Sequence, residues 1–129
     1  VSATDRDKLA VVPVVRDLID LGFTIIATAG TKQVLAAQGL VVESVLKLHE
    51  GRPNVLDIIK NGEIQMIINT PSGEEAQADG KLIRRTALVY KIPIVTTIAG
   101  ATATAAAIKS LQSQPLEVKA LQDYIGLGH

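Results

Sequence analysis

The sequence predicts an α/β fold in which a parallel β-sheet is covered by helices on both faces. Short runs of β-branched residues alternate with stretches whose apolar residues recur at helical spacing, which is typical of parallel strands joined by crossover helices. The expected strands contain few polar residues, as strands do when both faces of their sheet are covered. The chain has 129 residues, of which 47% are hydrophobic and 20% are charged, so we expect one domain over residues 1–129.

Strands and helices are expected to alternate along the chain. Strands are expected at residues 1–3, 23–28, 40–45, 64–69 and 94–97. Helices are expected at residues 4–21, 30–39, 54–61, 82–90 and 101–111, and a last one is expected to begin at Pro115. Polar loops are expected at residues 47–53 and 71–80. Right-handed crossovers between parallel strands leave few topologies for this order.

Local signals set the expected ends of the first helix. Thr4 and Asp7 have the spacing of a capping box at its start, and Leu9 is the first of the apolar residues that recur along it. Pro13 predicts a kink or a frayed first turn, because proline has no backbone N–H to donate. Gly22 is a suitable stop, because glycine readily adopts the left-handed conformation that ends many helices.

Later helices carry similar signals. Gly39 is expected to end the second helix, and Asn54 is expected to cap the third. The alanine-rich stretch at residues 99–107 predicts a helix that packs closely on the sheet, because small side chains let two elements approach each other.

Composition excludes several classes of protein. The chain has 13 Lys and Arg residues against 13 Asp and Glu residues, and this balance argues against a non-specific nucleic-acid or membrane-surface binder. Cysteine is absent, which excludes disulfides, thiolate zinc sites and cysteine nucleophiles. No apolar run approaches the ~20 residues that a membrane-spanning helix needs. The chain starts at Val1 without a signal-peptide pattern, so we expect a cytoplasmic fragment of a longer protein.

The second expected strand ends in Thr28-Ala29-Gly30-Thr31, directly before a helix. Two hydroxyl groups, a glycine that lets backbone N–H groups approach a ligand, and a helix N-terminus together suit a phosphate group. Threonine also caps helices without any ligand. On local sequence alone, this plain capped turn is the simpler interpretation.

The loop after the third strand carries charged residues that suit an anion or acid–base chemistry. Lys47 and Arg52 could act as charge partners of an anion, and His49 next to Glu50 could transfer protons. A solvated charged loop also explains His49 and is the interpretation that we favour for it. The role of Lys47 stays open at this point.

Two further strands end in hydroxyl or amide side chains. The fourth strand ends in Asn69 and Thr70, and the fifth ends in Thr97. Because ligands of parallel α/β sheets bind at the carboxyl ends of the strands, we expect these side chains and the Thr28–Thr31 turn to form one anion site. The sequence contains no P-loop, no dinucleotide-binding glycine motif, no metal-ligand cluster and no nucleophile elbow.

Several motifs of the chain resemble those of one family. They are the Thr28–Thr31 turn, His49-Glu50-Gly51-Arg52-Pro53, Asn69-Thr70-Pro71-Ser72-Gly73 and Ile83-Arg84-Arg85. In this order, and over essentially the whole chain, they resemble the methylglyoxal-synthase-like domain at the C-terminus of the large subunit of carbamoyl phosphate synthetase. The resemblance implies a three-layer, Rossmann-like sandwich with a five-stranded parallel sheet.

The resemblance also implies a regulatory role. In bacterial synthetases this domain binds UMP, an inhibitor, and IMP, an activator, while ornithine binds mainly in the neighbouring domain. The parent enzyme is a ligase that makes carbamoyl phosphate from bicarbonate, glutamine and ATP for pyrimidine and arginine synthesis. The implied partners are the other domains of the large subunit, the glutaminase small subunit and a second copy of the chain. ATP with Mg²⁺ or Mn²⁺ belongs to the parent enzyme, and no cofactor is expected in this domain.

Effector-binding positions of the family are transferred only where its motif matches. The expected effector-binding residues are Lys8, Thr28, Gly30, Thr31, Lys47, Asn69, Thr70 and Thr97. Pro71 and Gly80 stand where the family pattern has hydroxyl side chains. These two departures leave the identity of the effector open.

Two alternative functions stay open. The first is a true methylglyoxal synthase acting on dihydroxyacetone phosphate, in which Glu50 would replace the aspartate base of the synthases. Residues 69–72 supply no titratable group for that chemistry, so we expect no catalytic residue in this domain. The second alternative is an oligomerisation module without a ligand, which exposed apolar side chains would support.

Overall fold

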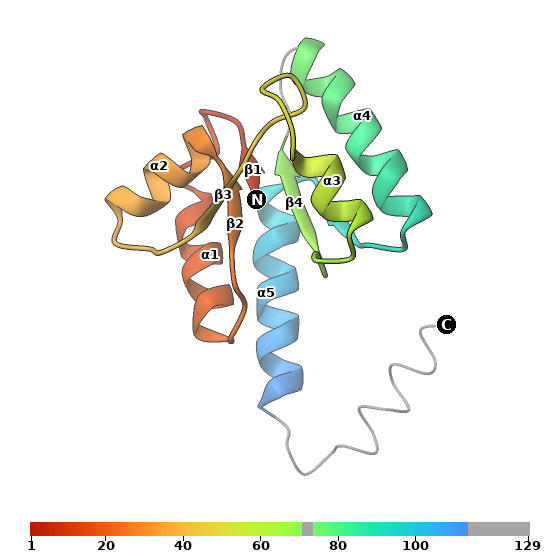
Figure 1. Ribbon diagram of the computed structural model, residues 1–129. Coiled ribbons are helices and arrows are strands. Elements are labelled where there is room, and N and C mark those ends of the chain that lie inside the picture. The colour runs from red at the N-terminus through yellow and green to blue at the C-terminus, as the bar shows by residue number, and fades with distance from the viewer. Residues whose placement is uncertain (71–73, 114–129) are drawn as a thin grey trace.

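The computed structural model describes residues 1–70 and 74–113 (Figure 1). The strands are β1 (Ser2–Ala3), β2 (Ile26–Thr28), β3 (Glu43–Val45), β4 (Ile67–Thr70) and β5 (Ile94–Val95). The helices are α1 (Val11–Asp20), α2 (Ala29–Ala37), α3 (Val55–Lys60), α4 (Glu74–Val89) and α5 (Ile98–Gln112). The helix expected from Pro115 and the family departure at Pro71 lie outside the described residues. None of the described helices is long and apolar enough to cross a membrane.

The strands form two parallel sheets that are joined through Val1. β4 pairs with β1 on one side and β5 on the other, and β2 pairs with β3. The Val1 amino group donates a hydrogen bond to the Ile26 carbonyl (2.7 Å), and the Thr28 N–H donates to the Val1 carbonyl (3.2 Å). The predicted α/β fold with parallel strands is confirmed. The described strands pair as sheets of three and two, however, and not as the single five-stranded sheet expected.

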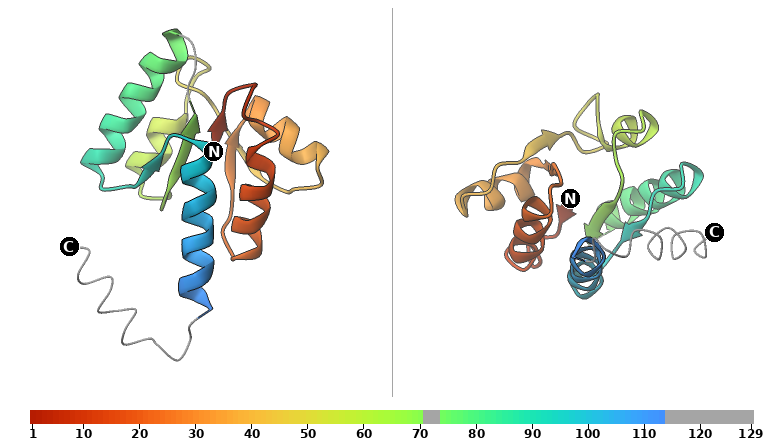
Figure 2. Two further views of the ribbon diagram at one scale, coloured as in Figure 1. Left: turned by 180° about the vertical axis from the view of Figure 1, so that it is seen from behind. Right: turned by 90° about the horizontal axis from the view of Figure 1, so that it is seen from below.

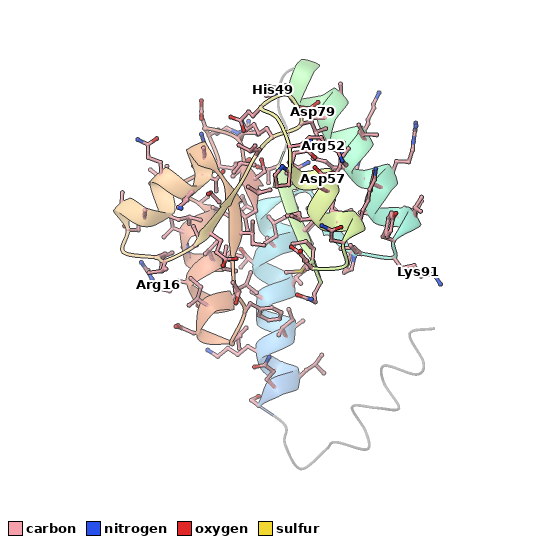
Figure 3. The ribbon with its side chains drawn as sticks, in the orientation of Figure 1. Arg16, His49, Arg52, Asp57, Asp79 and Lys91 are labelled. Atoms are coloured by element: carbon pink, nitrogen blue, oxygen red, sulfur yellow. The ribbon has the colours of Figure 1, made fainter. Side chains whose placement is uncertain are left out.

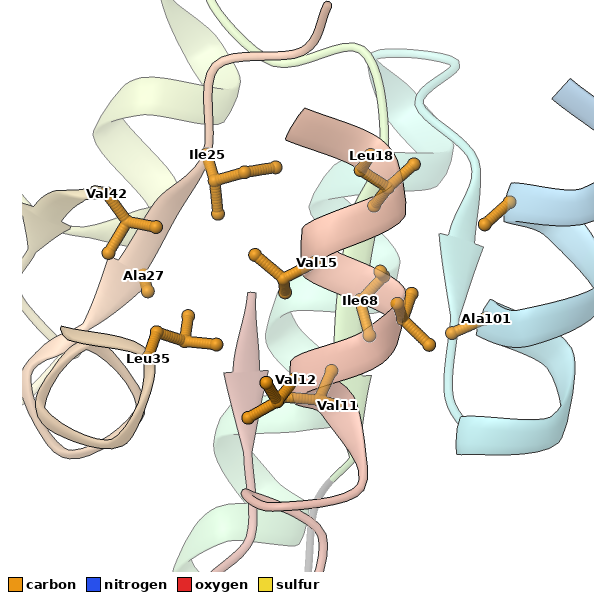
Figure 4. Close-up of a cluster of buried hydrophobic side chains, with 12 residues drawn as sticks. Val11, Val12, Val15, Leu18, Ile25, Ala27, Leu35, Val42, Ile68 and Ala101 are labelled. Atoms are coloured by element: carbon orange, nitrogen blue, oxygen red, sulfur yellow. The ribbon is translucent and has the colours of Figure 1, made fainter. Parts of the chain in front are cut away.

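Helices cover both faces of the three-stranded sheet (Figure 2). Successive residues of β4 show this, because neighbouring side chains of a strand point to opposite faces. Ile68 is buried in a cluster with residues of α1 and α5, whereas Ile67 is buried with Ile59 of α3 and Ile83 of α4. Figure 4 shows the first cluster, in which one side of α1 faces β2 and Ile68. β4 is therefore packed between two helical layers, with α1 and α5 on one face and α3 and α4 on the other.

The first helix begins later than predicted. α1 starts at Val11, and the Thr4 hydroxyl donates to the Asp7 carboxylate (3.0 Å) in a separate turn before it, so the predicted helix start and capping box at Thr4 are wrong. Leu9, expected among the core residues, is 69% exposed in this turn. Pro13 is the third residue of α1, where a backbone N–H has no acceptor within the helix. Proline is therefore accommodated there without the loss of a helical hydrogen bond.

α4 begins within the segment predicted to be a loop. Its first residue is Glu74, so residues 74–80 are helical and the predicted loop at 71–80 is wrong there. Glutamate, glutamine and alanine in this stretch are strong helix formers, and they outweigh Gly80, which is buried inside the helix. α5 also starts earlier than predicted, at Ile98, directly after its N-cap residue.

Other helix ends agree with the predictions. Gly22 and Gly39 follow α1 and α2 with φ angles of 101° and 80°, in the left-handed region that favours glycine. The Asn54 side chain caps α3 by accepting from the Leu56 N–H (3.0 Å), and Asp57 accepts from the Asn54 N–H (2.8 Å). This capping box fixes the end of the loop that leads from β3 into α3.

Candidate functional site

The residues predicted to bind an anion lie at the carboxyl ends of the strands. Thr28 ends β2, and Thr70 ends β4 with Asn69 directly before it. Lys8 lies in the turn after β1, and Lys47 lies in the loop after β3. Because the strands are parallel, these ends lie along one rim of the molecule, at the top of Figure 1.

Four of the predicted residues are buried although they are polar. Thr28, Thr31, Asn69 and Thr70 are each at most 6% exposed. Asn54, the cap of α3, is the other buried polar residue in the described part of the chain. Burying an amide or a hydroxyl group costs free energy unless it is hydrogen-bonded. Each of the four groups therefore needs a partner in the protein or in a ligand.

The two threonines at the start of α2 contact β1 instead of capping the helix. Thr28 is the N-cap residue of α2, but its side chain makes no cap hydrogen bond, so the plain capped turn is wrong for it. Its hydroxyl oxygen lies 3.3 Å from Ser2 Oγ and 3.5 Å from Thr31 Oγ1, and Thr31 Oγ1 accepts from the Ala3 N–H (3.0 Å). The first N–H groups of α2 therefore remain available to a ligand. Ser2 was missed by sequence reasoning, because no turn or capping motif marks it.

Asn69 has an unmet hydrogen-bonding group at the centre of the rim. Its Nδ2 is buried and has no hydrogen-bond partner among the described residues. Asn69 is the register partner of Ser2 in the β1–β4 pair, so the two residues lie side by side. Thr70, in contrast, is engaged, since its Oγ1 accepts from the Thr4 N–H (3.1 Å). A buried amide without a partner costs about 1–3 kcal/mol, and a ligand that accepts its hydrogen bond would remove this cost.

Lys8 brings a positive charge to the start of α2. A Cβ added to Gly30 would lie 2.7 Å from Lys8 Nζ, so the glycine leaves open the space next to the ammonium group. The Lys8 side chain is 20% exposed and pairs with Asp5, whose side chain is 95% exposed. The ammonium group and the N-terminal end of the α2 dipole both favour an anion at this point.

The loop after β3 carries two basic residues, Lys47 and Arg52, of which Arg52 is paired with Asp57. Arg52 binds Asp57 through two nitrogen atoms (2.7 and 3.3 Å), and these hydrogen bonds are the main reason why the pKa of Asp57 is below its usual range. Arg52 is therefore paired with a carboxylate in this structure, and its suggested contact with an anion stays a prediction. Lys47 is exposed. The pKa of Asp5 is lowered mainly by its hydrogen bond from Lys8, and the charge of Lys47 makes a smaller contribution.

His49 and Asp79 face each other at the same rim (Figure 3). His49 Nδ1 lies 3.9 Å from Asp79 Oδ2, and their side chains are 55% and 33% exposed. Asp79 was missed by sequence reasoning, because its segment was expected to be a loop without a defined position. The expected lack of titratable groups after β4 therefore holds for residues 69–72 but not for this rim. Within the described residues, no three His, Cys, Asp or Glu side chains are grouped so that they could hold a metal ion.

Thr97 lies at the rim, and its side chain caps a helix. It is exposed, and its Oγ1 caps α5 by accepting from the Gly100 N–H (3.0 Å). β5 is the outer strand of its sheet. Thr97 therefore lies after the strand next to β4, and its hydroxyl oxygen is engaged by α5.

A cavity of about 480 Å³ runs along the strands and reaches the rim at Ser2, Thr28 and Asn69. Apolar residues of β2, β3, α3 and β4 line much of it, among them Ile26 and Ile58. A ligand at the rim can therefore place polar groups on the rim residues and has apolar space beside them.

Comparisons with known proteins show the family of the chain. A family model described as an MGS-like domain matches residues 10–96, more than half of the chain. The chain is 68% identical over 127 residues to the carbamoyl phosphate synthase large chain of Synechocystis sp., and 68% identical over 124 residues to that of Nostoc sp.. It is 51% identical over 124 residues to an arginine-specific carbamoyl phosphate synthase large chain, chloroplastic, of Oryza sativa subsp. japonica.

These relatives are much longer than the chain. The alignments cover 98%, 96% and 95% of the chain, but 12%, 11% and 11% of the three relatives. The chain therefore corresponds to one domain-sized part of such large chains.

Proposed function

We propose that this chain, which belongs to the MGS-like domain family, is the effector-binding domain of a carbamoyl phosphate synthase large chain. The proposed effector is a nucleotide of the UMP or IMP type. The observation that carries the proposal is the buried Nδ2 of Asn69, which has no partner among the described residues. Asn69 is the register partner of Ser2, and Ser2 in turn contacts Thr28 at the start of α2, whose side chain makes no cap hydrogen bond. The 68% identity to two large chains supports the choice of parent protein.

The phosphate group of the effector is proposed to bind at the start of α2. Backbone N–H groups there point at an anion, and Gly30 lets the ligand approach them. The hydroxyl groups of Thr28 and Thr31 are proposed to donate to phosphate oxygens. Thr31 accepts from the Ala3 N–H and can still supply its own hydrogen, whereas Thr28 would turn its hydroxyl from Ser2 and Thr31 to the phosphate. Lys8 supplies the charge next to Gly30, and Lys47 adds a second charge from the loop after β3.

The nucleoside part is proposed to bind along the adjoining strand ends. The Nδ2 group of Asn69 donates a hydrogen bond to an oxygen or nitrogen atom of the ribose or base. This bond removes the free-energy cost of burying the amide without a partner. Thr70, whose oxygen is held by the Thr4 N–H, offers its hydroxyl hydrogen next to it. The departures at Pro71 and Gly80 leave open which nucleotide binds.

Regulation of the parent enzyme follows if the nucleotide binds two of its states with different affinity. The proposed parent reaction makes carbamoyl phosphate from bicarbonate, glutamine and ATP with Mg²⁺ or Mn²⁺, in other domains of the large chain and a glutaminase small subunit. The proposed location is the cytoplasm, and the products serve pyrimidine and arginine synthesis. The relative from Oryza sativa, whose name includes "arginine-specific", supports the arginine branch.

The experiment that tests the proposal is a calorimetric titration of the chain with UMP and IMP. Uridine and inosine serve as controls without a phosphate group, and inorganic phosphate serves as a competitor. We expect one nucleotide to bind at one site, its nucleoside to bind far more weakly, and phosphate to compete. The proposal fails if neither nucleotide nor phosphate binds to the folded chain at millimolar concentration.

The alternative of a methylglyoxal synthase has one observation in its favour, namely the His49–Asp79 pair at the rim. A histidine and a carboxylate within 3.9 Å are the residue types that general acid–base catalysis uses. Incubation of the chain with dihydroxyacetone phosphate decides between the two functions. We expect no turnover, and turnover that His49→Ala or Asp79→Asn abolishes would replace the effector proposal.

Self-association is a second role that the surface supports. Leu88, Val89 and Tyr90 at the end of α4 are 79%, 70% and 45% exposed. A group of exposed apolar residues is typical of a contact surface. We expect sedimentation velocity to show a dimer that Leu88→Asp weakens, and a monomer at all concentrations would contradict this role.

A further inference from the structure

Asp5 pairs with the ammonium group of Lys8, which a bound phosphate is also expected to contact. We propose that Asp5 is an internal competitor of the effector phosphate: it pairs with Lys8 when the site is empty and is displaced when a phosphate group binds. This inference rests on the proposed phosphate site, and it assigns to that site a residue that lowers its affinity and sharpens its selectivity.

The geometry places one ammonium group between two anion positions. Asp5 Oδ1 lies 2.5 Å from Lys8 Nζ. The same Nζ lies against the start of α2, where a Cβ on Gly30 would come within 2.7 Å of it. A phosphate at the α2 N-terminus and the Asp5 carboxylate therefore compete for the hydrogen bonds of the same nitrogen atom.

Asp5 can leave Lys8 without disturbing the fold. Its side chain is 95% exposed, so a rotation returns the carboxylate to water and uncovers no core residue. The turn that carries it is held by other groups: the Thr4 N–H donates to Thr70 Oγ1 (3.1 Å), and the Asp7 N–H donates to the Thr4 carbonyl (2.9 Å). The backbone of the turn that carries Lys8 therefore keeps its place when the Asp5 side chain moves away.

Asp5 is also the carboxylate of this turn that faces the cations of the site. Its pKa is below the usual range, mainly because of the hydrogen bond from Lys8, with a further contribution from the charge of Lys47. The neighbouring Asp7 instead accepts from the Thr4 hydroxyl (3.0 Å) and lies 3.9 Å from Arg6 Nε. Both lysines that are predicted to bind the phosphate, Lys8 and Lys47, thus lower the pKa of Asp5 in the ligand-free molecule.

The exchange favours dianions over single carboxylates. Asp5 is itself a carboxylate with one negative charge, so a ligand that offers only another carboxylate gains little by replacing it. A phosphate monoester carries close to two charges at neutral pH and accepts hydrogen bonds from Lys8 and from the α2 N–H groups at once. Exposed ion pairs of this kind change an equilibrium by roughly 1.5- to 5-fold, and we expect an effect of that size.

The test compares Kd values for UMP, IMP and inorganic phosphate by calorimetry at low ionic strength. The variants are Asp5→Asn, Lys8→Gln and the double variant, with Asp20→Asn as the control for the change in charge. Asp20 is exposed and is the last residue of α1, whereas Lys8 lies before the first residue of that helix. We expect Asp5→Asn to tighten binding about 2- to 5-fold, Asp20→Asn to leave it unchanged, and Asp5→Asn to have no effect when Lys8 is Gln.

The outcomes separate this inference from the function on which it rests. If the unaltered chain binds nucleotide and Asp5→Asn binds equally or more weakly, the competitor role is overturned while the proposed function stands. Equal tightening by Asp20→Asn, or by Asp5→Asn in the Lys8→Gln background, also overturns it, because the effect would then come from net charge. If the unaltered chain binds neither nucleotide nor phosphate, the proposed function fails and the role of Asp5 fails with it.

Discussion

Lys8 and Gly30 lie so close together that no side chain fits between them. A Cβ on Gly30 would lie 2.7 Å from Lys8 Nζ and 3.4 Å from Lys8 Cε. This contact brings the ammonium group to the first turn of α2, although Lys8 belongs to the turn after β1. Residues from two strand ends therefore meet at one anion position.

Gly30→Ala is expected to weaken nucleotide binding without lowering the stability of the fold. Alanine is a better helix former than glycine, so the free energy of unfolding should stay equal or rise by up to about 1 kcal/mol. The flexible end of Lys8 must move away from the added methyl group, and we expect the affinity for the nucleotide to fall about tenfold. Thermal unfolding and calorimetry on the same sample check both parts. An unchanged affinity would show that Lys8 does not act at the start of α2.

Asn69→Leu is expected to abolish binding without a loss of stability. Leucine has a similar size and removes the buried Nδ2 that lacks a partner among the described residues. The free energy of unfolding should stay equal or rise by about 1 kcal/mol, because an unsatisfied donor is removed.

Asn54→Leu is the matched control for this change. Asn54 is similarly buried, but its side chain accepts from the Leu56 N–H and caps α3. Its replacement should lower the free energy of unfolding by about 0.5–2 kcal/mol, which urea unfolding measures. If Asn69→Leu destabilises the chain as much as Asn54→Leu, Asn69 has a structural role and the site loses its main support.

The Thr28 hydroxyl is expected to be required for binding. Thr28→Val keeps the shape of the side chain but cannot donate to a phosphate, so we expect affinity to fall roughly 10- to 100-fold, as for a lost hydrogen bond to a charged group. Thr28→Ser keeps the hydroxyl and should bind nearly as well as the unaltered chain. The combined Thr28→Ala and Thr31→Ala variant should lose binding and remain folded, although it leaves the Ala3 N–H without its Thr31 partner. Calorimetry that shows equal affinity for Thr28→Val and Thr28→Ser would reject the assignment.

The fold could be predicted from the sequence where local signals and packing agree. The Asn54 cap and the glycines at positions 22 and 39 act within a few residues, and the structure confirms them. The start of α4 could not be predicted, because Pro71 and Gly80 suggest a loop whereas the residues between them favour a helix. The Thr4–Asp7 pair has capping spacing, but it closes a separate turn, and the choice depends on contacts with the distant Thr70.

The candidate site was predictable as a set of strand ends but not in its details. Parallel strands bring Thr28 and Asn69 to one rim, and this follows from topology alone. The partners of each group depend on register: Ser2 faces Thr28 and Asn69 because β1 lies between β2 and β4. Thr97, like Thr28, is the N-cap residue of the helix that follows its strand, yet only the Thr97 hydroxyl caps that helix. Only three-dimensional contacts distinguish these two threonines.

The Asp57 carboxylate is expected to stabilise the fold in a pH-dependent way. Its pKa lies below the usual range, mainly because Arg52 donates hydrogen bonds to it, with a further contribution from the Asn54 N–H. A carboxylate whose pKa is lower in the folded state stabilises that state above its unfolded pKa of about 3.9, and this contribution is lost as the pH falls through the folded pKa. Asp57→Asn should therefore be less stable than the unaltered chain at pH 7, and the difference should shrink below about pH 4. Urea unfolding at both pH values measures it, with Asp20→Asn as the control. A difference that stays constant down to pH 3 would show that the charge of Asp57 does not stabilise the loop that carries Lys47.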